Sequence, residues 1–290
     1  MVAEQRGLAE RSFDELIAEA MAAPFSGWNF SFLRGRTEYE PLPWDYARVV
    51  GDLAGDRALL DLGTGGGEVL ARLPARPVRT VATEAWAPNV PVAGRRLGRL
   101  GIPVVQYEGA PGNLAQDAAA AVGAGGTGEA GGGERLPFRD GAFGMVISRH
   151  ESFRATEVAR VLGPGGWFVT QQVDLHWADD FRVALGLPPD ADGAEVGGGA
   201  GGAGSWLPVA RRQVQKAGLV VKRAQAATVR CTFTDVGAVA YYLLRAVPWL
   251  VPEAGLPVGR AALLRLHERM RDAPLVVRNP HFMLVARQPG

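Results

Sequence analysis

Cysteine is almost absent from this sequence, and so is net charge. Cys231 is the single cysteine among 290 residues, so neither an internal disulfide nor a thiolate metal cluster can form. We interpret it as a small core or strand residue. With 31 Lys and Arg against 30 Asp and Glu, the net charge is +1. This balance argues against a large surface that binds phosphate backbones regardless of sequence.

Long apolar runs are also missing. No run approaches the roughly 20 residues that a bilayer-spanning helix needs. The first 20 positions carry several acidic residues where a secretory signal would be basic and then apolar. We therefore expect a cytoplasmic protein without a membrane partner. The 47% share of hydrophobic residues is that of a globular chain with a sizeable core.

Strand-like apolar runs alternate with helical patterns along most of the chain. Seven strands are predicted, at residues 58–62, 78–84, 103–107, 143–148, 167–172, about 219–230 and 282–287. Helical patterns lie between them. Strands that alternate with helices predict an α/β fold whose sheet is mostly parallel and has helices on both faces.

Three stretches interrupt this alternation within a main domain of residues 51–290. Residues 121–133 and 192–204 consist largely of glycine and alanine. They cannot bury enough apolar surface to become ordered, so we interpret both as flexible insertions. Residues 235–272 carry two helical patterns and are interpreted as a helical insertion before the last strand.

Residues 1–50 are expected to form an addition to this domain. Ser12 and Glu15 precede an apolar helical pattern with the spacing of a capping box. An unusually aromatic segment follows, from Phe25 to Tyr46, without a clear period. It is interpreted either as a loop that packs its aromatic rings on the main domain or as a lid over a ligand site, and the two are compatible.

A glycine-rich turn follows the first predicted strand of the main domain. The apolar run ends at Asp61, and Gly63-Thr64-Gly65-Gly66-Gly67 leads into a helical pattern. Glycine permits positive φ and close approach of a ligand to the backbone. The free N–H groups of such a loop favour a carboxylate or a phosphate. This pattern alone does not separate a dinucleotide from another nucleoside cofactor.

An acidic residue ends the second predicted strand. Glu84 lies roughly 20 residues beyond the glycine turn, where a carboxylate can accept hydrogen bonds from both ribose hydroxyls of a nucleoside. The alternative is a solvated acid at a strand end. Trp86 either covers the adenine face or packs on the next helix.

Four blocks together carry a resemblance to a known family. Residues 60–67 resemble the first motif of the class I S-adenosylmethionine-dependent methyltransferases, and in particular those similar to methyltransferase type 11. Glu84 matches the acidic residue with which this family binds the ribose. Residues 134–146 resemble the segment that enters the family's fourth strand. Residues 157–166 are similar to the helix and turn before its fifth strand. The blocks keep the family's order over about residues 55 to 175.

The resemblance implies a Rossmann-like fold whose seventh strand is antiparallel, and S-adenosyl-L-methionine as the cofactor. The methionine part would meet Asp61, Gly63, Thr64, Gly65 and Gly67. The ribose would meet Glu84, and the sheet edge at Ser148 would also contact the cofactor. The spacing Gly63-x-Gly65-x-Gly67 differs from the G-x-G-x-x-G of pyrophosphate binders.

The adenine partner is left open by the sequence. The resemblance places adenine at the loop after the third strand together with Leu136. The family often has an acid shortly before Leu-Pro-Phe, but here an insertion separates Glu108 from Glu134. Either acid, or a backbone group near Leu136, could bind the adenine.

The turn after the fourth strand holds the candidate catalytic residues. His150 could act as a general base on an O or N nucleophile, because its reference pKa lies near neutrality. Glu151 could orient it or take its role. The alternative is a loop that contacts the cofactor or caps a helix, since methyl transfer needs alignment more than acid–base help. Gln171 and Gln172 are expected to face the substrate.

Absent motifs narrow the substrate. No Asn-Pro-Pro-Tyr follows the fourth strand, which disfavours amino-methyltransferases of DNA adenine or glutamine, and Cys231 is misplaced for cytosine C5 chemistry. Neither a histidine spacing nor a carboxylate cluster indicates a metal. Tyr241, Tyr242 and Trp249 could cover an apolar small molecule. We expect O- or N-methylation of a small molecule by a monomer or homodimer. RNA methylation is the second hypothesis, and a non-catalytic nucleoside-binding protein the third.

Overall fold

The structure is a computed structural model, and it describes residues 11–74, 76–107, 135–187, 205–246 and 257–290. Some predictions fall outside these ranges. They concern the two glycine-rich insertions and the residues Glu108, Glu134 and Trp249. In the described ranges, no helix combines the length and the apolar character that crossing a membrane requires.

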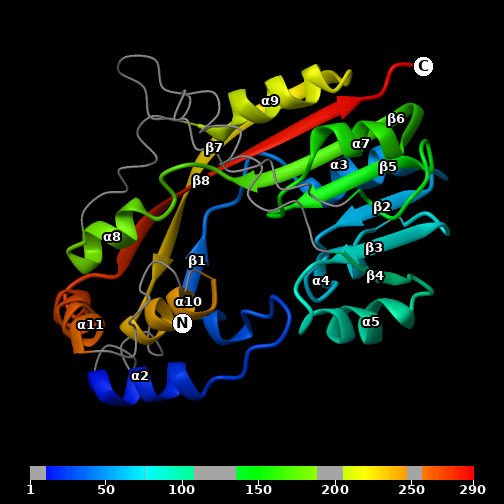
Figure 1. Cartoon of the computed structure of the whole chain (residues 1–290). Coiled ribbons are helices and arrows are strands. Elements are labelled where there is room, and N and C mark those ends of the chain that lie inside the picture. Colours follow the sequence, from blue (N-terminus) through cyan, green and yellow to red (C-terminus); the bar gives the residue numbers. More distant parts are fainter. Residues whose placement is uncertain (1–10, 75, 108–134, 188–204, 247–256) are drawn as a thin grey trace, which may run out of the picture.

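One mixed sheet of eight strands organises the described chain, in the order β1-β7-β8-β6-β5-β2-β3-β4 (Figure 1). The strands are β1 (Thr37–Tyr39), β2 (Leu59–Leu62), β3 (Thr80–Glu84), β4 (Val104–Gln106), β5 (Phe143–Arg149), β6 (Leu162–Val173), β7 (Val220–Phe233) and β8 (Leu275–Arg287). The pairs among β2 to β6 are parallel. Strand β8 is antiparallel to both β6 and β7. The predicted Rossmann-like α/β fold with an antiparallel last strand is therefore confirmed.

The eighth strand is the difference from the prediction of seven. Strand β1 pairs antiparallel with β7 at one edge of the sheet. It has three residues, too few for a period-two pattern to appear in the sequence. The last strand also begins earlier than expected, because Leu275 and the residues after it pair with the far end of β7.

Helices cover both faces of the sheet, and each face has its own core. The helices are α2 (Phe13–Ala22), η1 (Ser31–Leu33, a 3-10 turn), α3 (Tyr46–Ala54), α4 (Glu68–Ala71), α5 (Val90–Gly98), α7 (Ala155–Val161), α8 (Asp179–Leu185), α9 (Trp206–Lys216), α10 (Val236–Ala246) and α11 (Pro257–Met270). Leu60 and Val146 face α7 and α9. Leu59 and Ile147 face α3, α4 and α5. Adjacent strand residues thus enter opposite cores, as the pleat requires.

A third core lies where β7 and β8 extend beyond the neighbouring strands. We call η1, α2, α8, α10 and α11 the cap. In Figure 1 its four α-helices gather at one end of β7 and β8, with α9 at the other end. Phe181, Phe233, Tyr241 and Leu263 are among its buried residues. The cap joins the N-terminal addition to the predicted helical insertion, and it adjoins the carboxyl ends of β6 and β7.

The N-terminal helix forms as its sequence predicts. The Ser12 hydroxyl accepts the backbone N–H of Glu15, and the Ser12 backbone N–H donates to the Glu15 carboxylate. This capping box satisfies two donors that a helix start would otherwise leave unpaired. The helix buries Phe13, Leu16 and Ala20 in the cap.

Candidate cofactor and active site

The glycine turn between β2 and α4 depends on three alternate glycines. Gly63, Gly65 and Gly67 have φ of 64°, 62° and 78°, in the left-handed region that other residues adopt only at a cost. The Thr64 N–H donates to the carbonyl oxygen of Thr83 at 2.8 Å. This bond ties the turn to the adjacent strand β3.

The N–H groups of this turn are already engaged within the protein. Gly67 donates to the Thr64 carbonyl at 3.0 Å, and Gly63 donates to the Thr83 hydroxyl at 3.3 Å. Gly65 donates to Glu84 Oε2 at 2.6 Å. The expectation of free N–H groups that bind an anion is wrong for these residues and for Thr64. The turn offers close approach to its backbone rather than a set of vacant donors.

Glu84 is fixed beside the turn by two backbone donors. Its Oε2 accepts from Gly65, and its Oε1 accepts the N–H of Trp86 at 2.9 Å. Burial raises the pKa of Glu84, and hydrogen bonds from Trp86, Gly65, Asn89 and Ala85 partly counteract this. A carboxylate oxygen has two lone-pair sites, and the bonds from Gly65 and Trp86 use one site on each oxygen. The indole of Trp86 is 56% exposed and lies free of the next helix core.

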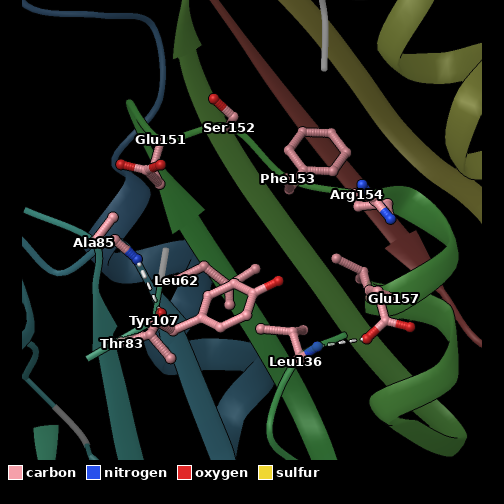
Figure 2. Close-up of a pocket in the computed structure, with 12 residues that line it drawn as sticks. Leu62, Thr83, Ala85, Tyr107, Leu136, Glu151, Ser152, Phe153, Arg154 and Glu157 are labelled. Atoms are coloured by element: carbon pink, nitrogen blue, oxygen red, sulfur yellow. Dashed lines mark hydrogen bonds between the residues drawn. The ribbon is translucent and has the colours of Figure 1, made fainter. Parts of the chain in front are cut away.

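A small hollow of about 30 Å³ lies at the carboxyl ends of β2, β3 and β5 (Figure 2). This volume is far below the roughly 300–1,000 Å³ typical of small-molecule sites, so side chains must move before a nucleoside can enter. Its walls carry both apolar and polar side chains, namely Leu62, Thr83, Ala85, Tyr107, Leu136, Glu151, Ser152, Phe153, Arg154, Glu157 and Val158, together with Gly63. The predicted adenine neighbour Leu136 is buried, and its N–H donates to Glu157 Oε2 at 2.8 Å.

Sequence reasoning did not single out two aromatic walls of this hollow. Figure 2 shows Tyr107 beside Leu62 and Leu136, with Phe153 across from them. Tyr107 directly follows β4, and Phe153 lies two residues before α7. Their positions at the carboxyl edge of the sheet are the signal that could have found them, because ligands of open α/β sheets bind at that edge.

Four side chains of the protein lie directly on the glycine turn, namely those of Glu151, Trp28, Glu68 and Leu97. A Cβ built on Gly63 would come within 2.1 Å of Glu151 Cγ, and one on Gly65 would come within 2.4 Å of Trp28 Cδ1. The missing side chains at these glycines therefore leave space that Glu151 and Trp28 enter. Trp28 is 52% exposed, so it covers the turn without being locked in a core.

The aromatic segment that carries Trp28 is anchored on the cap. Tyr241 of α10 donates its hydroxyl to the carbonyl oxygens of Pro24 and Asn29, each at 3.3 Å. The ring of Phe32 lies 4.6 Å from that of Tyr241. The rings of Phe25, Phe30 and Phe32 thus pack on the cap, whereas Trp44 and Tyr46 pack on the sheet. The tip of the segment at Trp28 reaches the glycine turn.

The turn after β5 is stabilised by two side chains that the sequence predicts to contact the cofactor or the substrate, Ser148 and Gln172. Ser148 is fully buried, and its hydroxyl donates to the Glu151 carbonyl at 2.8 Å. Gln172 Nε2 donates to the same oxygen at 2.9 Å. Both side chains therefore stabilise the turn. His150 adopts φ of 58°, a left-handed conformation uncommon outside glycine, and the residue keeps part of its surface exposed.

His150 lies at the end of a hydrogen-bonded row. Trp44 Nε1 donates to Gln171 Oε1 at 2.9 Å, and Gln171 Nε2 lies 3.4 Å from His150 Nε2. The ring of His281 is 5.5 Å away. Burial by the surrounding protein, with the charge of Arg149 and the presence of His281, lowers the pKa of His150 well below its usual value. The imidazole is therefore neutral at pH 7.

Carboxyl groups converge around the glycine turn. Burial raises the pKa of Asp61 to about 7, and the nearby Glu84 and Glu151 add to this. Burial and the charge of Glu84 raise the pKa of Glu151 to about 7 as well. Acids that share a site lose their protons more readily when a cation enters. The turn therefore favours a positively charged ligand and disfavours a pyrophosphate. In the described ranges, no group of His, Cys, Asp and Glu residues could hold a metal ion.

One protein family and several solved structures are similar to this chain. A family model described as a methyltransferase domain matches residues 60–170. No curated protein matches the chain. Similar solved structures include a putative methyltransferase of Bacillus halodurans, with 16% identity over 84% of this chain and 97% of that one and a TM-score of 0.48. Another is a functionally unknown protein of Deinococcus radiodurans, with 14% identity over 87% of this chain and 90% of that one and a TM-score of 0.49.

These structural likenesses carry no argument about activity, because their TM-scores and identities are low. The family match covers β2 to β6, together with the glycine turn, Glu84 and the turn after β5. Residues 60–170 of this chain therefore match the methyltransferase domain family, in agreement with the class I resemblance that the sequence carries.

Proposed function

We propose that the chain is an S-adenosylmethionine-dependent methyltransferase that acts on an O or N nucleophile of a small molecule. The observation that carries this proposal is the position of Glu84, bonded to the glycine turn at 2.6 Å and adjoining the hollow. A buried acid with spare lone pairs beside an apolar hollow is suited to the ribose and base of a nucleoside.

The residues present fit this cofactor. Glu84 would accept the ribose hydroxyls, and Tyr107, Leu136 and Phe153 would enclose the adenine. The acids around the turn would compensate the positive charges of the methionine part. When bound, S-adenosylmethionine supplies a methyl group on a positively charged sulfur, which a nucleophile can attack directly. Trp28 and Glu151 would swing off the glycines to admit it and then exclude water.

Glu151 is the better candidate to receive a proton from the substrate. Its pKa of about 7 suits a general base that works near neutral pH. Its side chain lies on Gly63, next to the position proposed for the methionine part. His150 has a strongly lowered pKa, and its Nε2 faces the Gln171 amide, so it is a weak base in this setting.

The cap supports a small molecule as the methyl acceptor. It adjoins the carboxyl edge of the sheet beside His150 and Gln171, and its aromatic segment extends over the glycine turn. A covered site of this kind suits a compact substrate that can be sealed from water. The near-zero net charge gives no support to a long polyanion as substrate.

The test has a binding step and a transfer step. S-adenosylhomocysteine should raise the melting temperature, and NAD should not; equal shifts would contradict the cofactor assignment. Labelled S-adenosylmethionine is then incubated with a metabolite extract and, in parallel, with an RNA fraction. Label in small molecules supports the proposal, whereas label in RNA favours the second hypothesis. Binding with no transfer to either fraction would favour a non-catalytic nucleoside-binding protein.

A further inference from the structure

A half-buried arginine near the proposed methyl-transfer site has no hydrogen-bonding partner among the described residues. Arg149 ends β5 and pairs in register with Gln171 of β6. In the described part of the chain, its guanidinium makes no hydrogen bond, and no carboxylate lies within 4 Å of it. Asp61 and Tyr46 interact with it electrostatically at longer range. A largely enclosed guanidinium usually pairs with an oxyanion, so this one is available for a ligand.

His150 offers a second donor next to Arg149. The Trp44 indole can only donate, so Gln171 must accept through Oε1 and present Nε2 as a donor. That Nε2 lies nearest to His150 Nε2, which must then be the acceptor. A neutral imidazole that accepts at Nε2 carries its hydrogen on Nδ1. The hydrogen-bonding network therefore assigns His150 an N–H that can donate to a ligand.

Tyr46 adds a third polar group at the inner side of this region. Its hydroxyl is buried and has no hydrogen-bond partner among the described residues. The side chains of Asp61 and Arg149 are close enough to affect its pKa. Buried polar groups are usually hydrogen-bonded, so an exception next to an unpaired arginine indicates that a further oxygen atom belongs here.

We propose that Arg149 and His150 bind a carboxylate of the methyl acceptor, so that the substrate is a small organic acid. This inference rests on the proposed function. The arginine fork matches the two oxygens of a carboxylate, and the next residue in the chain, His150, is close enough for the charge of Arg149 to act on it. A single positive charge offsets a carboxylate, whereas a phosphate dianion would stay under-neutralised near Asp61 and Glu151.

Arg149 is assigned to the substrate rather than to the cofactor because of its place in the sheet. Its neighbour in register is Gln171 of β6, and the ring of His281 from β8 lies beyond His150. The cofactor hollow lies on the other side, toward β2 and β3. A carboxylate held at Arg149 would place the rest of the acceptor between the cap and the glycine turn.

The binding test uses the protein loaded with S-adenosylhomocysteine. Straight-chain and arylalkyl monocarboxylates should raise its melting temperature, and the matching primary amides should not. Arg149→Met should weaken the best carboxylate roughly 10- to 100-fold, the loss of a charge-assisted bond. Arg149→Lys should recover part of the affinity. Arg99→Met, at an exposed arginine that directly follows α5, should have no effect.

Several outcomes would overturn the inference. One is equal stabilisation by amides and carboxylates, and another is no stabilisation by any carboxylate. A third is an Arg149→Met protein whose affinity for S-adenosylhomocysteine falls as much as its affinity for the carboxylate, which would give Arg149 to the cofactor. If Arg149→Met does not fold, the wild-type comparison of acids with amides and the Arg149→Lys protein still decide.

A transfer test separates this inference from the proposed function. The metabolite extract is divided on an anion exchanger, and each fraction receives labelled S-adenosylmethionine. Label found only in the retained, acidic fraction supports both the proposed methyltransferase function and the inference of an acidic substrate. Label confined to the unretained fraction overturns the inference and leaves the methyltransferase intact. No label in either fraction counts against the proposed function, and the carboxylate binding test then judges the inference alone.

Discussion

The Oε2 atom of Glu84 accepts the backbone N–H of Gly65 at 2.6 Å, so the acid at the end of β3 and the glycine turn after β2 form one unit. Replacing Glu84 with alanine should weaken S-adenosylhomocysteine binding by roughly 1–3 kcal/mol, the range for a lost charged hydrogen bond. Isothermal titration calorimetry measures this loss.

The control for this prediction is Asp52→Ala. Asp52 is an exposed acid on α3 that pairs with Arg48 and does not line the hollow. Its loss should leave the affinity for the nucleoside within about twofold, because it makes no contact there. If the wild type and Glu84→Ala bind S-adenosylhomocysteine equally well, Glu84 does not bind the ribose.

The raised pKa values of Asp61 and Glu151 predict how stability depends on pH. Both acids rise from ordinary values of 3.8 and 4.5 to about 7 because they are buried. Between about pH 4 and pH 7 the native protein holds protons that the unfolded chain has lost, so this contribution to stability decreases as pH rises. Glu151→Gln should flatten this dependence in urea unfolding. A steeper dependence, or an unchanged one, would contradict the assignment.

The same acids predict the pH dependence of cofactor binding. A cationic ligand binds their ionised forms better, so affinity for S-adenosylmethionine should increase as pH rises from about 6 to about 8. S-adenosylhomocysteine lacks the sulfonium charge and should show a smaller increase. Calorimetry in buffers of different ionisation enthalpy should also detect protons released on binding. An affinity for S-adenosylmethionine that is independent of pH would be inconsistent with this site.

Trp28 is expected to slow cofactor entry. Its indole lies on Gly65, where the methionine part would approach the backbone. Trp28→Ala should therefore increase the association rate of S-adenosylhomocysteine, as measured by stopped-flow mixing. The melting temperature should change little, because the indole is 52% exposed. Met21→Ala, also at an exposed apolar residue, is the matched control. A slower association would show that Trp28 helps to capture the cofactor instead.

Trp44→Phe tests the hydrogen-bonded row behind His150. The substitution keeps the aromatic packing and removes the donor to Gln171 Oε1, which is 2% exposed as a residue. A buried acceptor left unpaired costs about 1–3 kcal/mol, which urea unfolding can measure. Gln171→Leu in the same background should add little further loss, because its partner is already gone. Additive losses would show that the two side chains act independently.

Much of the fold could be predicted because it depends on local patterns. The alternation of strands and helices, the capping box at Ser12 and the glycine turn each have a signature within a few residues. The cap could not be predicted in this way. Its core joins Phe13, Phe181, Phe233 and Leu263, which are far apart in the chain and meet through tertiary packing alone.

The site shows the same division. Glu84 and the glycines at positions 63, 65 and 67 follow from a motif. The roles of Ser148 and Gln172 in the turn depend on the oxygen of Glu151, and no spacing in the sequence reveals that contact. Tyr107 follows β4 and Arg149 ends β5, and neither strand has an unusual sequence. The roles of these two residues depend on the strands that lie beside them, which the sequence does not reveal.

Strands β7 and β8 pair from the domain core into the cap, and their one register shift, between Val221 and Arg223, lies at the end away from the cap. The ribbon is regular where it enters the cap, so the cap and the sheet are expected to move as one rigid body. Ligands must then enter and leave through another part of the molecule. The segment between α2 and α3 connects the cap to the sheet by side-chain contacts at Trp28 and Trp44. Movement of this segment would then limit the rate of turnover. Changes in its length are expected to alter substrate selectivity before they alter the rate of methyl transfer.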